Sequence, residues 1–146
     1  MLIGINPLLH PDILHTLAAM GHGDRLAIVD ANFPSASIAR GLVVRQPLQI
    51  NCDAVTAVKA ALSVFPIDKF EPDVPPVEGM AVVGDPDAIP AVVAEAAPLF
   101  AAQGHAVSLI ERFAFYDAVR SCFAIIRTCE ERPYGNFVIR KGTVGF

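Results

Sequence analysis

The chain of 146 residues has the length of one ordinary domain, and 53% of its residues are hydrophobic while 18% are charged. This composition excludes a disordered chain and allows a core that needs neither disulfides nor a metal. The 15 acidic residues outnumber the 11 Lys and Arg, which are scattered along the chain, so a nucleic-acid-binding face is not expected. The high apolar content suggests that other copies cover part of the surface in a homo-oligomer.

The apolar runs are interrupted well before the roughly 20 residues that a membrane-spanning helix needs, so no transmembrane segment is expected. The first residues, MLIGINPLLHPD, lack the basic start and long apolar centre of a signal peptide, which predicts a cytoplasmic protein. Cys52, Cys122 and Cys129 show neither CxxC spacing nor a disulfide framework. We assign none of them a catalytic role.

The first half of the chain begins with helical signals. Pro11 fits the first helical position, and Gly21 follows about ten residues later as a helix stop. Asp53 is a good N-cap for a further helix, which ends before Pro66. The predicted elements are a helix over 11–20, a strand over 26–30, a short extended piece over 42–44 and a helix over 54–64.

The second half opens on a proline-rich connection over residues 71–79, EPDVPPVEG, which is expected to be a stiff surface loop rather than a domain linker. Asp85 and Asp87 favour a helix start, and Pro98 is expected to kink or divide that helix. The predicted elements are a strand over 80–83, a helix from 85 to about 103, a strand over 107–110, a helix over 113–121, and strands over 123–128 and 136–140.

The alternation of helices and strands predicts an α/β fold in a single domain covering residues 1–146. Such alternation favours a three-layer α/β/α sandwich with helices on both faces of a mostly parallel sheet. We expect the last two strands to pair as a hairpin, which makes the sheet mixed.

The most distinctive polar residues lie in residues 20–34, MGHGDRLAIVDANFP. His22 stands between two glycines, so a tight loop can present its imidazole, either as an acid or base or as a simple turn residue. Asp30 follows a buried strand, at the carboxyl end where open α/β sheets collect ligands. Its alternative role is that of a strand-end cap.

Further polar candidates lie near the end of the chain. Taken alone, Arg112 is a surface ion-pair partner and Tyr116 a core residue. Tyr134, Gly135 and Asn136 place a phenol and an amide at the lip of a strand, where they suit hydrogen bonds to hydroxyls or form an ordinary turn. No two histidines have metal-ligand spacing, and the Gly-His-Gly segment precedes a strand rather than a helix. We therefore expect no metal and no phosphate loop.

Four separated motifs carry a resemblance to a known family. MGHGD, DANFP, ERFAFYDA and ERPYGNFVIRKG occur in the order found in the family of L-fucose mutarotases and D-ribose pyranases. The chain resembles the fucose branch over nearly its whole length. The resemblance implies a cytoplasmic, cofactor-free sugar isomerase with an RbsD-like fold, assembled as a homo-oligomer that is often a decameric ring with sites near subunit contacts.

The resemblance also implies roles for individual residues. His22 matches the acid/base of the family, Asp30 and Arg112 match substrate-binding residues, and residues 134–136 match the Tyr-Gly-Asn segment that touches the sugar. After DANFP the chain reads VVRQPLQINCDA, where the fucose branch carries an Ile-Arg-Ala-Asp-Gly-like segment. This departure leaves the identity of the sugar open.

The expected reaction exchanges the α and β anomers of a monosaccharide, with L-fucose as the leading substrate. The anomeric hydroxyl loses its proton while the ring oxygen gains one, and the open-chain aldehyde recloses on its other face. Only proton transfer is needed, which positioned acid/base groups supply. The alternatives are a mutarotase or pyranase acting on ribose or another sugar, and a non-catalytic monosaccharide-binding or regulatory subunit, which would not need His22 in its glycine frame.

Overall fold

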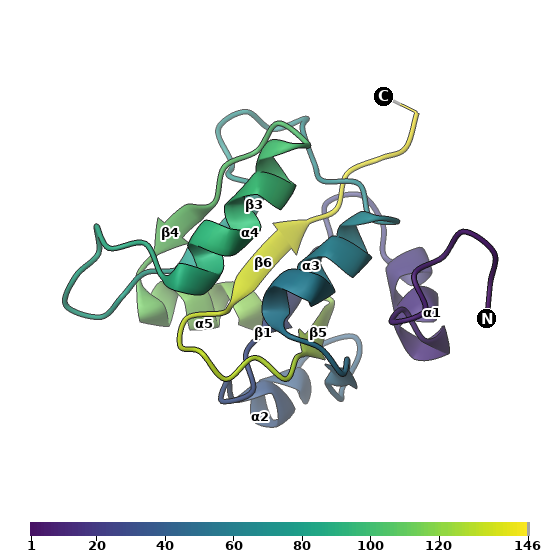
Figure 1. The fold of residues 1–146 in the computed structure, drawn as a ribbon, viewed down its shortest axis with the longest axis horizontal. Coiled ribbons are helices and arrows are strands. Elements are labelled where there is room, and N and C mark those ends of the chain that lie inside the picture. Colours follow the sequence, from purple (N-terminus) through teal and green to yellow (C-terminus); the bar gives the residue numbers. More distant parts are fainter. Residues whose placement is uncertain (146) are drawn as a thin grey trace.

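The chain folds into one six-stranded sheet with helices on both faces (Figure 1). The structure is a computed structural model and describes residues 1–145. The helices α1, α3 and α4 cover one face and α2 and α5 the other, so the predicted three-layer α/β/α sandwich is confirmed. The elements are α1 (Pro11–Ala19), β1 (Arg25–Val29), α2 (Ser35–Ala39), β2 (Leu48–Gln49), α3 (Ala54–Leu62), β3 (Val77–Met80), α4 (Ala91–Ala101), β4 (Ser108–Ile110), α5 (Arg112–Arg120), β5 (Ala124–Arg127) and β6 (Phe137–Arg140).

The strand order across the sheet is β2-β5-β1-β6-β3-β4. The pairs β2 with β5, β5 with β1 and β3 with β4 are parallel, while β6 runs antiparallel to both β1 and β3. The sheet is therefore mostly parallel and mixed, as predicted, but the expected hairpin of the last two strands is wrong. β5 and β6 instead flank β1, because this apolar strand is buried on both faces and takes a partner on each edge.

The core has two parts, one on each face of the sheet. Alternate side chains of β1 point to opposite faces, so Leu26 and Ile28 pack under α1, α3 and α4 while Ala27 and Val29 pack against α2 and α5. Phe137 on β6 joins the first part and is fully buried. A buried aromatic or aliphatic side chain of this size contributes about 1.5–3 kcal/mol, so the central strands anchor both layers.

Several boundaries differ from the sequence prediction. The strand predicted over 80–83 occupies Val77–Met80, so its first three residues lie in the segment expected to be a loop. Gly79 allows this placement, because a Cβ there would lie 3.0 Å from side-chain atoms of Leu109 and Val107 on the adjacent chain segment. The piece predicted over 42–44 is not a strand, and neither α2 nor β2 was predicted.

The helix predicted from residue 85 begins only at Ala91. A turn intervenes, in which the amide of Asp85 donates to the carbonyl of Val82 and Gly84 has a φ of +79°. Pro90 takes the N-cap position, where its missing N–H costs nothing. Pro98 lies inside α4, which runs unbroken over Ala91–Ala101, so the expected division of this helix is wrong.

The topology sorts the loops into two edges. β1, β3 and β4 are parallel and β6 runs antiparallel to β1 and β3. The carboxyl ends of β1, β3 and β4 therefore lie beside the start of β6, along the side of the sheet where these strands end; this side, which is not an outer strand, is called here the carboxyl edge. The loop before β1 and the end of β6 lie at the opposite side, called the amino edge.

In residues 1–145 no helix is both long and apolar enough to cross a membrane.

Candidate functional site

A polar cavity lies at the carboxyl edge of the sheet. Its volume is about 220 Å³, and it is lined by side chains from segments far apart in the sequence. It brings together four of the residues singled out from the sequence: Asp30 after β1, Arg112 after β4, and Tyr134 and Asn136 before β6. The other lining residues are Asn32, Phe33, Met80, Val83, Tyr116 and Pro133.

Asp30 and Asn136 form a buried pair that lines the cavity. The Nδ2 of Asn136 donates to the Oδ2 of Asp30 at 3.0 Å, and the backbone N–H of Asp30 donates to the Oδ1 of Asn136 at 2.9 Å. The other oxygen of Asp30 accepts from the amide of Asn32 at 3.0 Å. Burial raises the pKa of Asp30, although the hydrogen bond from Asn136 opposes this shift. The pair fixes a carboxylate with spare acceptor capacity facing the cavity.

Arg112 supplies hydrogen-bond donors to the same cavity. It is the first residue of α5, whose N-cap Glu111 accepts from the amides of Phe113 and Ala114 at 2.8 and 3.1 Å. The Nε of Arg112 is buried and has no hydrogen-bond partner within residues 1–145. Its guanidinium carbon lies 4.7 Å from the ring centroid of the exposed Phe113. A buried donor without a partner is costly, so a ligand oxygen is the natural acceptor.

Tyr134 is held in an unusual backbone conformation, with a φ of 63°, the one positive value outside glycine in residues 1–145. A left-handed conformation at such a residue costs about 1–3 kcal/mol and persists only where its surroundings impose it. The hydroxyl of Tyr134 accepts from the amide of Val83 at 3.1 Å, so its own proton stays available to donate. The phenol therefore closes one side of the cavity.

Gly135, the middle of the predicted Tyr-Gly-Asn segment, does not line the cavity. A Cβ at this position would lie 2.8 Å from the Cγ of Glu130 and 3.4 Å from a methyl of Val92. Glycine is needed here because the backbone lies against the α3 and α4 layer. The close approach is to the core rather than to the polar cavity.

The buried carboxylate of Glu130 anchors residues 130–136 to the neighbouring helices. Glu130 accepts from the amide of Ala54 at 3.3 Å and from the Nε of Arg132 at 2.9 Å. Arg132 also donates to Glu95 on α4 at 2.7 Å. The hydrogen bonds from Arg132 outweigh burial and hold the pKa of Glu130 below its ordinary value. This network ties residues 130–136 to α3 and α4 and fixes Tyr134 and Asn136 over the cavity.

His22 lies at the amino edge, apart from the cavity. A five-residue strand separates it from Asp30, and at about 3.3 Å per residue the two edges are roughly 16 Å apart. One monosaccharide cannot reach both in a single chain. Of the two glycines that flank His22, only Gly23 adopts a positive φ, +86°, and its amide donates to the carbonyl of Lys141 at 2.9 Å.

The imidazole of His22 contacts a buried acid that the sequence did not single out. The Nε2 of His22 lies 3.1 Å from the Oδ1 of Asp68, in the connection between α3 and β3. The ring packs edge-on against Phe70 with centroids 5.3 Å apart. The other oxygen of Asp68 forms an ion pair with the Nε of Arg140 at 3.0 Å.

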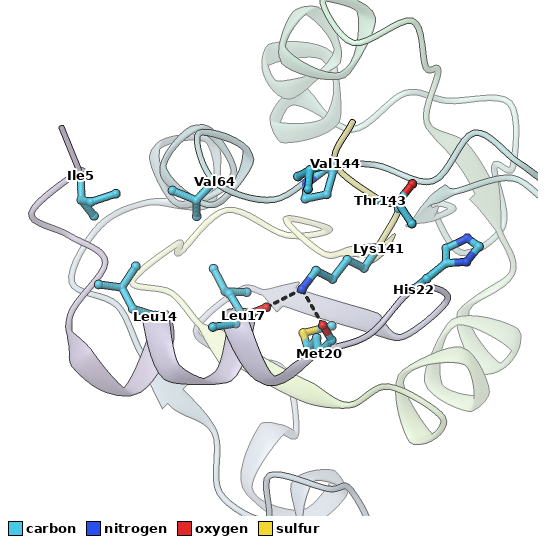
Figure 2. A pocket seen from close by; sticks show the side chains of 12 residues that line it. Ile5, Leu14, Leu17, Met20, His22, Val64, Lys141, Thr143 and Val144 are labelled. Carbon is cyan, nitrogen blue, oxygen red and sulfur yellow. Dashed lines mark hydrogen bonds between the residues drawn. The ribbon is translucent and has the colours of Figure 1, made fainter. Parts of the chain in front are cut away.

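His22 also borders a second, larger cavity of about 540 Å³ at the amino edge (Figure 2). The lining is mostly apolar and comes from α1, residues 64–66 and the segment after β6. Lys141 lines this cavity, and Figure 2 shows its side chain extending to the end of α1, where its Nζ donates to the carbonyls of Leu17 and Met20 at 2.7 and 2.5 Å. Lys141 therefore caps α1 with its ammonium group.

Three contributors to these sites were missed or misjudged from the sequence. Tyr116, interpreted as a core residue, does pack against the core on the face of α2 and α5, but it also lines the polar cavity, which was not foreseen. Asp68 and Glu130 are buried carboxylates without a local motif, so only their distant partners reveal them. A buried acid is costly unless it is paired, but the sequence does not show which acids are buried.

Cys52 and Cys122 are not activated thiols. Burial raises the pKa of Cys52 to about 11 and that of Cys122 to about 12. No cluster of three or more His, Cys, Asp or Glu side chains in residues 1–145 is arranged to hold a metal ion.

The fold and the cavity define a class: a three-layer α/β/α protein whose polar cavity suits a small hydroxylated molecule. Comparison with known proteins is more specific. The model of the RbsD / FucU transport protein family matches residues 3–144, and the chain belongs to this family.

The relatives cover nearly the whole chain. A fucose mutarotase of Danio rerio is 34% identical over 158 residues, covering 99% of this chain and 95% of the relative. The crystal structure of protein Atu2016, described only as a candidate sugar binding protein, has 44% identity and a TM-score of 0.92, covering 99% of this chain and 97% of that one. The fucose mutarotase of Streptococcus pneumoniae, solved in complex with L-fucose, has 30% identity and a TM-score of 0.82, covering 98% and 99%.

Proposed function

We propose that this protein is a cofactor-free mutarotase that interconverts the α and β anomers of a monosaccharide, with L-fucose as the leading substrate. The convergence of Asp30, Arg112, Tyr134 and Asn136 on one cavity carries this proposal, because a carboxylate, a guanidinium, a phenol and an amide suit a ring of hydroxyls. Full-length relatives named fucose mutarotase support it. We place the protein in the cytoplasm.

The side chains of the cavity have complementary roles in this proposal. Asp30 accepts hydrogen bonds from sugar hydroxyls with the lone pairs that its protein partners leave open. Arg112 donates from its unpartnered Nε to a ring or hydroxyl oxygen. Tyr134 donates its free hydroxyl proton, and Asn136 holds Asp30 in place while offering its remaining N–H. These contacts orient the sugar but leave a proton carrier to be supplied.

His22 is the proposed proton carrier, and it serves a sugar bound by a neighbouring copy. His22 and the polar cavity lie at opposite edges of one chain, so the partner subunit's His22 must complete each site. The apolar cavity beside His22, with exposed Val144 nearby and exposed Met1, Leu2 and Ile3 at the chain start, supports a subunit contact there. We therefore propose a homo-oligomer, and from the family resemblance a decameric ring.

The proposal is tested by saturation-transfer NMR at the anomeric protons of L-fucose, with D-ribose in parallel. The wild type should accelerate exchange of one sugar, and His22→Ala and Asp30→Ala should each lose it, by roughly 100-fold or more for the acid/base group. A preference for D-ribose would assign the ribose alternative. Binding without accelerated exchange would assign the non-catalytic binding subunit, which the separation of His22 from the cavity in one chain favours as the second candidate.

Mixed oligomers test the shared site. Refolding His22→Ala together with Asp30→Ala should restore activity, because some sites then combine an intact Asp30 with an intact His22 from a different chain. Random mixing gives roughly a quarter of such sites. Each variant refolded alone is the control. A mixture as inactive as the controls would contradict the shared site.

A further inference from the structure

We propose that Asp68 is a positioning residue for His22: it holds the imidazole with Nε2–H directed at the carboxylate and Nδ1 directed at the sugar. The inference rests on the proposed function, because it assigns the orientation of the ring that carries the proton.

The contact joins a buried acid to a partly exposed base. The Nε2 of His22 lies 3.1 Å from the Oδ1 of Asp68, and the side chains are 44% and 2% exposed. The acid is thus inside the protein while the far side of the ring is open to solvent or to a second chain. The edge of Phe70, with centroids 5.3 Å apart, limits rotation of the ring.

The backbone at Asp68 is held in place by the end of β6. Its backbone N–H donates to the carbonyl of Arg140 at 3.0 Å, and Ile67 pairs with Lys141 in an isolated antiparallel bridge. Gly142 allows this pairing, because a Cβ there would lie 2.6 Å from the carbonyl oxygen of Ile67. The backbone that carries Asp68 is therefore fastened to the end of β6, next to the loop of His22.

The carboxylate is also kept charged. Its Oδ1 accepts from the amide of Phe70 at 3.1 Å, and its Oδ2 pairs with the Nε of Arg140 at 3.0 Å. Arg140 in turn donates to Glu71 at 2.7 Å. Burial pushes the pKa of Asp68 upward, but the hydrogen bonds from Phe70 and His22 and the charge of Arg140 outweigh it, so the pKa lies below its ordinary value.

A charged acceptor fixes the tautomer of its partner. An ionised Asp68 can only accept, so the facing Nε2 of His22 must carry a proton, and in the neutral ring the Nδ1 is then the free base. The same carboxylate stabilises the imidazolium that forms when Nδ1 takes a proton from the sugar. The exposed Nδ1 therefore takes the proton from the anomeric hydroxyl and also returns a proton to the ring oxygen.

The first measurement uses the unaltered protein and needs no activity. Long-range proton–nitrogen NMR of the His22 ring, at a pH where the imidazole is neutral, should show the Nε2–H tautomer with an unprotonated Nδ1. A dominant Nδ1–H tautomer, or an equal mixture of the two, would overturn the proposal.

The second measurement compares Asp68→Asn with Glu71→Gln, a matched control that removes a carboxylate from the same cluster without touching His22. Asp68→Asn should lower kcat for anomer exchange by between about 10-fold and 1,000-fold, with KM little changed and the Nε2–H tautomer lost. Glu71→Gln should keep both kcat and the tautomer. Retention of wild-type kcat by a folded Asp68→Asn variant would overturn the proposal.

The two failures can be told apart. If wild type and His22→Ala give the same exchange rate, the proposed catalytic role of His22 fails whatever Asp68 does. If His22→Ala is inactive and Asp68→Asn is fully active, the proposed function stands and the role of Asp68 fails.

Discussion

The paired side chains of Asp30 and Asn136 allow a sharp test of the polar cavity. The substitution Asn136→Asp keeps the shape of the side chain but replaces the Nδ2 that donates to Asp30 by an oxygen. Two carboxyl oxygens would then face each other at the present 3.0 Å. Either both carboxylates stay ionised or the folded protein retains one proton between them.

Both routes cost a similar free energy at neutral pH. With an effective dielectric constant of about 20, two charges 3.0 Å apart repel by about 5–6 kcal/mol. Holding one proton at pH 7 on a group with an ordinary pKa of 3.8 costs about 4 kcal/mol, at 1.36 kcal/mol per pH unit. The proton route is cheaper, so Asn136→Asp should lose about 4 kcal/mol of unfolding free energy at pH 7 and about 1 kcal/mol at pH 4.5.

Urea unfolding across this pH range measures the effect. The folded variant binds a proton that its unfolded chain lacks, so its stability relative to wild type should fall as the pH rises, by about 1.36 kcal/mol per unit. The control is the double substitution Asp30→Asn with Asn136→Asp, which exchanges the two side chains. The new amide at position 30 would donate to the new carboxylate at position 136 and still accept from the backbone N–H of Asn32. Parallel curves for wild type and Asn136→Asp would refute the reasoning.

Three further predictions concern the stability of the segments that hold the two candidate sites in place. Glu130→Gln puts an N–H where Arg132 now donates and should cost about 1–3 kcal/mol at pH 7. The stabilisation from the depressed pKa of Glu130 is complete above about pH 4.5 and is lost as the pH falls below this value, so the cost of the substitution should shrink toward pH 3 in urea unfolding. Gly142→Ala places a Cβ 2.6 Å from a backbone oxygen and should lower stability by about 1–3 kcal/mol in thermal unfolding; an unchanged Tm would show that this segment moves freely. Asp53→Ala removes the N-cap of α3, whose side chain accepts an amide at 2.8 Å, and should cost about 1 kcal/mol; Asp53→Asn, which keeps an acceptor, should recover most of the loss.

The sequence predicted the elements better than their partners. The apolar run of β1 and the cap of α3 are local signals, and both elements lie within a residue or two of their predicted bounds. The position of β6 between β1 and β3 depends on pairings with residues more than fifty positions away, for which no local pattern exists. The hairpin expected from adjacency in sequence was therefore wrong.

The candidate site divides in the same way. The place of Asp30 after a buried strand predicted that it would face a ligand site, and in the structure Asp30 lines a polar cavity together with Arg112 and Asn136. The same argument could not show that His22, eight residues earlier, lies at the opposite edge, because that depends on the length of the strand between them. The sequence did not predict a role for Asp68, because only the pairing of residues 66–68 with the end of β6 brings this acid to His22.

The antiparallel strand in the middle of the sheet has a consequence for synthesis. β6 is the last strand within residues 1–145, yet it alone joins the three strands β2, β5 and β1 to the pair β3 and β4. Until residues 137–140 leave the ribosome, a nascent chain holds two separate half-sheets, each with an unpaired inner edge. Such edges are templates for pairing with other chains. A chain that stops short of β6 should therefore be caught by chaperones or aggregate.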